Sequence, residues 1–240
     1  MTESDERALA RQQRCIEDLC GAAIRAVSGQ PRLQWRGGRL WRGAERLPRQ
    51  APHLDPRFGE ADMRSFRGAA DGLALRACLS DEALHRRLQP GDAVQRLIFD
   101  MLEQFRVESL APPLQVGLRH NLEHRFRAWS DEFIASGLTE GSLGILLFTV
   151  AQVARTRITG EELPDLIADL IEGTRFGLAE LLGPAMRELR LLREDQAGYA
   201  RVALALAEQV ARRAAEEREQ GAGDSTDTEE AKDTRNGFEL

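Results

Sequence analysis

The chain has 240 residues, 42% of them hydrophobic and 5% aromatic, and its formal net charge at pH 7 is −6. This length buries a substantial core, and a core poor in aromatic residues favours packed helices. The acidic balance argues against a nucleic-acid-binding domain, three cysteines without a CxxC spacing indicate a reducing cytoplasm, and no apolar run approaches the roughly 20 residues of a membrane span. We therefore expect a mainly α, cytoplasmic protein.

The first predicted elements are a helix and a hairpin. Apolar residues recur at helical spacing over residues 6–27, which predicts an amphipathic helix. Over residues 33–42, alternating side chains flank Gly37-Gly38, a pair typical of a two-residue β-hairpin turn. Trp35 and Trp41 of this hairpin are expected to pack on helices, because an isolated hairpin is marginal in water. The alternative is that the two tryptophans form a docking surface for a partner.

Helical patterns fill the rest of the chain as far as residue 220. The predicted helices follow a proline-rich arm at 47–56 and cover 60–79, a short segment capped by Ser80, 93–111, 114–129, 141–156, 164–182 and 184–220. Asp92 is expected to cap the helix over 93–111, and Pro164 and Pro184 to lie in the first turns of theirs. We predict one bundle-like domain over 1–220 with a small hairpin, followed by a disordered acidic tail over 221–240.

The helix over 93–111 carries three charged residues of interest. At about 100° per residue, Glu108 falls within an apolar stripe, so it is expected to be partly buried and to need a partner such as Arg76. Glu103 and Arg106 fall toward the opposite, outer face, at a spacing that allows a local ion pair. We interpret Glu103, Arg106 and Glu108 as structural or partner-binding residues and assign no catalytic residue.

Residues 120–124, HNLEH, match the H-x-x-E-H order of inverted zinc peptidases. His120 and His124 lie four residues apart, on one helix face, where both could bind zinc, and Glu123 could act as a general base. No third ligand follows from the spacing. A zinc-dependent hydrolase is therefore kept as an alternative function, and no metal site is assigned.

Several segments together resemble the N-terminal helical region of the CobT subunit of aerobic cobaltochelatase. They are the hairpin with its Gly-Gly turn and proline-rich arm, ADGLALR at 70–76, FDMLEQFRVESL at 99–110 and LREDQAGYARVALALAEQV at 192–210. The acidic tail resembles the start of that family's acidic linker. The family's C-terminal von Willebrand A-like domain, with its D-x-S-x-S motif, has no counterpart in these residues.

The resemblance implies a function in aerobic cobalamin biosynthesis. It implies that the chain supports ATP-dependent insertion of cobalt into hydrogenobyrinic acid a,c-diamide, with two partners, an AAA+ ATPase subunit and a large corrin-binding subunit. An oligomeric ring is one arrangement that it allows. ATP-Mg and cobalt would be used by the complex, while this chain would bind no cofactor and have no active site of its own. A helical adaptor of another AAA+ system fits the same patterns and stays open.

Overall fold

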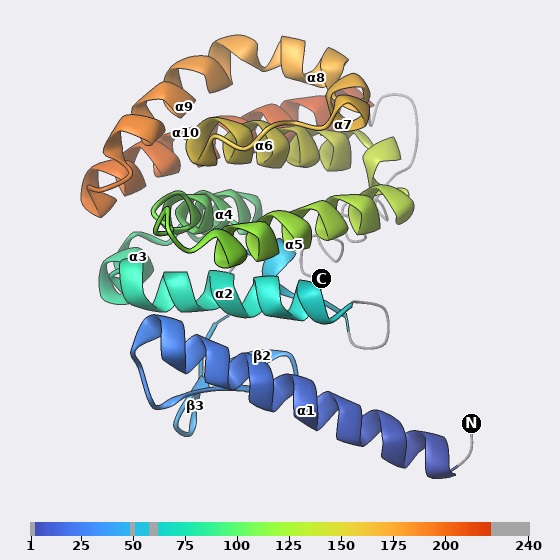
Figure 1. The fold of residues 1–240 in the computed structure, drawn as a ribbon. Helices are drawn as coiled ribbons and strands as arrows, with labels where there is room; N and C mark the ends of the chain where they lie inside the picture. Colours follow the sequence, from blue (N-terminus) through green and yellow to red (C-terminus); the bar gives the residue numbers. More distant parts are fainter. Residues whose placement is uncertain (1–2, 49–50, 58–61, 222–240) are drawn as a thin grey trace. The chain divides into compact units, whose positions relative to one another are not determined.

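The protein is mainly helical, as the computed structural model shows (Figure 1). The structure describes residues 3–48, 51–57 and 62–221. The described residues divide into two compact units: a hairpin unit, from residues 3–79 and 111–129, and an α4 unit, from residues 80–110 and 130–221. The mainly α fold with a small N-terminal hairpin is confirmed. The single domain over 1–220 stays a prediction, since two compact units are compatible with one domain, and the predicted disordered tail lies outside the described residues from 222 onward.

The hairpin unit begins with a long helix followed by a small antiparallel sheet. Its elements are α1 (Glu3–Ser28), β1 (Leu33–Arg36), β2 (Arg39–Arg42), β3 (Glu45–Arg46), the 3₁₀ helix η1 (Pro52–Leu54), α2 (Met63–Leu79) and most of α5 (Val116–Ala135). The predicted hairpin is confirmed: Gly37 and Gly38 have φ angles of 54° and 68°, the left-handed conformation that this turn requires. Strand β3 pairs with β2 and was not predicted, because two residues show no alternation.

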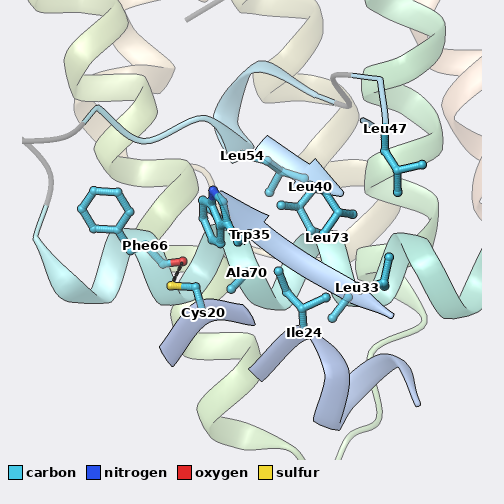
Figure 2. Close-up of a cluster of buried hydrophobic side chains, with 12 residues drawn as sticks. Cys20, Ile24, Leu33, Trp35, Leu40, Leu47, Leu54, Phe66, Ala70 and Leu73 are labelled. Carbon is cyan, nitrogen blue, oxygen red and sulfur yellow. Dashed lines mark hydrogen bonds between the residues drawn. The ribbon is translucent and has the colours of Figure 1, made fainter. Parts of the chain in front are cut away.

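An apolar cluster joins the elements of the hairpin unit (Figure 2). Its members include Cys20 and Ile24 of α1, Leu33, Trp35 and Leu40 of the hairpin, and Phe66, Ala70 and Leu73 of α2. Trp35 is 4% exposed, and its ring centroid lies 6.4 Å from that of Phe66. On α2, a Cβ at Gly68 would collide with the Asn121 carbonyl, so glycine permits the close approach of α5.

The α4 unit is a bundle of helices (Figure 1). Its elements are α3 (Glu82–Leu88), α4 (Ala93–Ser109), the end of α5, the 3₁₀ helix η2 (Leu138–Glu140), α6 (Ser142–Thr159), α7 (Asp165–Leu170), α8 (Glu172–Gly177), α9 (Ala179–Leu192) and α10 (Gln196–Gly221). Helices α6 and α10 pack on α4, and α9 packs on both of them. Among the described residues, no helix is long and apolar enough to cross a membrane.

The caps of α3 and α4 test two sequence predictions. Asp92 caps α4 as predicted, since its Oδ1 accepts a hydrogen bond of 2.9 Å from the Gln95 backbone N–H. The prediction that Ser80 caps α3 was wrong: Asp81 does so, with Oδ1 accepting from the backbone N–H groups of Ala83 and Leu84. Both residue types are good caps, and Ser80 is engaged elsewhere, by a carboxylate of α4.

The predicted helices over 164–182 and 184–220 are divided differently in the structure. The first is broken at Ile171 into α7 and α8, and α9 already starts at Ala179, so the prediction that Pro184 lies in a first turn was wrong. The buried stripe of α9, Leu182, Met186 and Leu189, runs through the proline, and this packing outweighs the one backbone hydrogen bond that proline cannot donate.

Candidate functional site

Helix α4 is buried all round over its second half. Every residue from Ile98 to Glu108 is buried, and both α6 and α10 pack on α4. Glu103 and Arg106 are each 2% exposed, so the prediction that they point outward was wrong. A single apolar stripe marks the buried face of a helix only where solvent covers the rest of it. The predicted ion pair itself is present.

The Glu103–Arg106 pair is bidentate and tied to its surroundings. Arg106 Nε donates to Glu103 Oε2 and Nη2 donates to Oε1, both at 2.8 Å. Nη1 donates to the Arg193 carbonyl oxygen at 3.0 Å, and the Ser80 hydroxyl donates to Glu103 Oε1 at 2.6 Å. Gln196 Nε2 in turn donates to Ser80 Oγ at 3.1 Å. These bonds join α4 to the segment before α3 and to the α9–α10 junction.

Glu108 is buried as predicted, and it has two donors within its own unit. Arg155 Nη1, from α6, donates to Glu108 Oε2 at 2.8 Å, and Gln104 Nε2 donates to Oε1 at 3.0 Å. Arg155 lies 47 residues further along the chain, so no local spacing could identify it. The predicted pairing with Arg76 stays a prediction, because Arg76 belongs to the hairpin unit.

A histidine and an aspartate add a third buried polar contact to the α4 unit. His85 Nε2, on α3, lies 2.6 Å from Asp100 Oδ1, and Gln89 Nε2 donates to both oxygens of the same carboxylate. The His85 ring stacks on Phe99, with centroids 4.5 Å apart. Sequence reasoning missed this contact, because Asp100 lies 15 residues from His85 and on another helix.

The geometry of the α4 unit favours a structural role for these charged groups. Glu103 and Glu108 each accept hydrogen bonds from an arginine and from a neutral side chain, so their oxygens face donors that are already in place. Within the part of the chain that the structure describes, no three His, Cys, Asp or Glu side chains are grouped to hold a metal ion. The network binds helices of the α4 unit together.

The HNLEH segment lies on α5 in the hairpin unit, and its residues have separate surroundings. His120 is exposed, Glu123 accepts from Arg127, and His124 Nε2 lies 3.0 Å from Asp62 Oδ2. Burial raises the pKa of Asp62, but the Ser65 backbone N–H and His124 outweigh it, so the net shift is downward. Asp62 and His124 thus join the start of α2 to α5. The zinc-hydrolase interpretation gains no support from the described residues.

Two further polar groups of the hairpin unit are buried. Burial raises the pKa of Asp71, against the opposing effects of Asn121 and Arg67, whose side chains both donate to its carboxylate at 2.9 Å. Burial likewise raises the pKa of the Cys20 thiol to about 12, so it stays protonated and donates to the Phe66 carbonyl. Both contacts tie neighbouring helices together.

The two tryptophans of the hairpin differ in accessibility. Trp35 is buried in the apolar cluster, which confirms the prediction that it packs on helices. Trp41 is half-buried, and its Nε1 donates to the Arg36 carbonyl at 3.3 Å across the turn. A partner-binding role for the hairpin stays a prediction, and Trp41 is the more accessible of the two.

The chain is similar to a known protein family. The sequence model of a protein family described as "Cobalamin biosynthesis protein CobT" matches residues 15–239. The matched range begins within α1 and includes every later described element of both units. No solved structure matches the chain.

Proposed function

Because the chain belongs to the CobT family of cobalamin biosynthesis proteins, we propose that it is the accessory, non-ATPase subunit of an ATP-dependent cobaltochelatase. In this proposal it binds an AAA+ ATPase subunit and a large corrin-binding subunit. It supports their insertion of cobalt into hydrogenobyrinic acid a,c-diamide, and cobalt is the substrate of the complex rather than a resident metal of this chain.

The observation that carries the proposal is the family match over residues 15–239. The packing of the α4 unit is consistent with it. Two of the segments that resemble the family, 99–110 and 192–210, contact each other there: the Tyr199 hydroxyl donates to the Leu102 carbonyl at 2.7 Å, and the Arg106 guanidinium lies 6.0 Å from the Tyr199 ring centroid. These segments hold one bundle together.

The buried charges support a binding role rather than a catalytic one. Carboxylates that do acid–base chemistry must reach a substrate, whereas Glu103 and Glu108 are enclosed and bonded to arginines. ATP hydrolysis and corrin binding are accordingly assigned to the partner subunits in this proposal. In this proposal, the chain itself contributes partner binding, through residues on its surface.

Co-purification tests the proposal. The tagged chain is mixed separately with the AAA+ subunit and the large subunit, with and without ATP-Mg, and the complexes are separated by size-exclusion chromatography. We expect a complex with at least one of the two subunits. Binding to neither of them, by a chain whose circular dichroism shows the helical fold, would exclude the proposed function.

A further inference from the structure

Helices α7 and α8 of the α4 unit expose large apolar side chains. Leu166 is 84% exposed and Phe176 is 85% exposed, and Leu170, one turn after Leu166, is 42% exposed. Helix α7 contacts α8, and α8 in turn contacts α9 (Figure 1). Three such side chains within eleven residues are unusual for a surface with no partner.

These side chains are not needed to hold α7 and α8 in place. Ile167 and Ile171 lie on the inner side of the same segment and are buried, as are Leu178 and Leu182 just after it. Leu166, Leu170 and Phe176 are instead the exposed large apolar side chains of this segment. We call the exposed side of α7 and α8 that carries them the α7–α8 surface.

The charges around the α7–α8 surface are almost all negative. Residues 161–183 contain six carboxylates and one arginine. The side chains of Glu162, Asp165, Asp169 and Glu172 are exposed, and none of them forms an ion pair with a described residue. Unpaired carboxylates next to exposed apolar groups suit a ligand that carries positive charge beside an apolar stripe.

We propose that the α7–α8 surface docks a positively charged amphipathic helix of a protein partner. Leu166, Leu170 and Phe176 would contact the apolar stripe of that helix, and the four carboxylates would pair with its Arg or Lys side chains. The carboxylates disfavour an anionic lipid surface. The net charge of −6 on this chain disfavours a second copy of it. The inference rests on the proposed function, since it assigns the surface through which a chelatase subunit binds.

The first test compares two pairs of exposed apolar residues. The docking variant carries Leu166→Ser and Phe176→Ser, and the matched control carries Leu114→Ser and Leu191→Ser, which replace equally exposed leucines outside the surface. Affinities for the AAA+ subunit and the large subunit are measured by biolayer interferometry. We expect the docking variant to bind one of them at least about tenfold more weakly and the control to bind as the wild type does, because central apolar anchors dominate binding.

The second test addresses the charges. Glu162→Gln, Asp169→Asn and Glu172→Gln are combined and compared with Glu188→Gln, Glu194→Gln and Glu208→Gln, three exposed carboxylates elsewhere in the unit. We expect only the first set to slow association and to flatten its dependence on salt, as charge-steered encounters do.

The outcomes separate the two proposals. If the wild type binds a subunit and the docking variant binds it equally well, the α7–α8 inference is overturned and the proposed function stands. If the folded wild type binds neither subunit, the proposed function fails and this assignment fails with it. If sedimentation shows a wild-type dimer that the docking variant abolishes while subunit binding is unchanged, the occupant is a second copy and the inference is overturned.

Discussion

The apolar cluster of the hairpin unit and the core around α4 bury different kinds of side chain. The cluster that joins α1, α2 and the hairpin is apolar, whereas α4 buries two carboxylate–arginine pairs in its own core. Apolar side chains stabilise any arrangement that hides them from water, but a buried carboxylate is tolerated only where donors stand at the right positions. The core around α4 is therefore more narrowly specified than the apolar cluster, and it contains the most distinctive family-like segment, 99–110.

This difference predicts unequal responses to small changes. Shortening an apolar side chain leaves a small cavity, whereas removing one member of a buried ion pair leaves the other member uncompensated. Five substitutions, one of them added to another, follow from the largest expected effect to the smallest.

Arg106→Met should give the largest loss. It leaves the Glu103 carboxylate buried beside Ser80 with its bidentate partner gone, so we expect about 3–5 kcal/mol less stability in urea unfolding followed by circular dichroism. Arg187→Met, on the exposed side of α9, is the control and should change little.

A double variant separates the loss of the pair from the orphaned charge. Adding Glu103→Leu to Arg106→Met should restore at least about 1 kcal/mol, because no uncompensated charge then remains. If the double variant is less stable than Arg106→Met alone, the account of this pair is wrong.

Glu108→Gln should have an intermediate effect. The amide still accepts one hydrogen bond but loses the charge opposite Arg155, and we expect a loss of roughly 1.5–3 kcal/mol, the range for hydrogen bonds to charged groups. Hydrogen exchange of the α4 amides should accelerate, while the folded fraction binds partners as the wild type does. Unchanged stability with lost partner binding would instead show a functional contact; Glu208→Gln, exposed on α10, serves as control.

Ile24→Val in the apolar cluster should cost less. It removes one methylene from a fully buried side chain, which typically destabilises a protein by about 0.5–1.5 kcal/mol. Tryptophan fluorescence reports the hairpin unit, since Trp35 belongs to the same cluster. Leu9→Ala, at an exposed position of the same helix, should be near neutral. A loss as large as that of Arg106→Met would remove the contrast between the units.

Asp71→Asn should change the pH dependence of stability more than its magnitude. Burial raises the pKa of Asp71 in the folded protein above 3.8, so the folded state holds this proton more tightly than the unfolded state does. Its contribution to stability therefore falls as pH rises from 3.8 through the folded pKa. The Asp71→Asn variant should lack this fall. The free energy of unfolding of both proteins is measured from pH 3.8 upward. Equal slopes of unfolding free energy against pH for the wild type and the variant would contradict a raised pKa of Asp71 in the folded state.

Local signals predicted much of the fold. The Gly37-Gly38 turn, the alternation around it and the cap at Asp92 each depend on a few neighbouring residues, and all three are confirmed. The C-terminal end of α2 and the position of α4 also follow from the helical spacing of apolar residues and from the residues that begin and end helices.

Tertiary packing decided what the sequence patterns missed. Glu103 and Arg106 look solvent-facing on a helical wheel, but both are buried, where Ser80 and the Arg193 carbonyl bond to them. The Arg155 partner of Glu108 lies on a different helix, beyond any periodicity. Ser80 and Asp81 are both residue types that cap helices. The hydrogen bond from the Ser80 hydroxyl to Glu103, a residue 23 positions away, could not be seen in the local sequence.

Reconstituted cobalt insertion tests the central claim most directly. The AAA+ subunit and the large subunit are mixed with ATP-Mg, cobalt and hydrogenobyrinic acid a,c-diamide, with or without this chain, and the metal-bound corrin is followed by its absorbance. We predict that cobalt enters the ring only when the chain is present. Insertion at the same rate without the chain would contradict its role as a chelatase subunit.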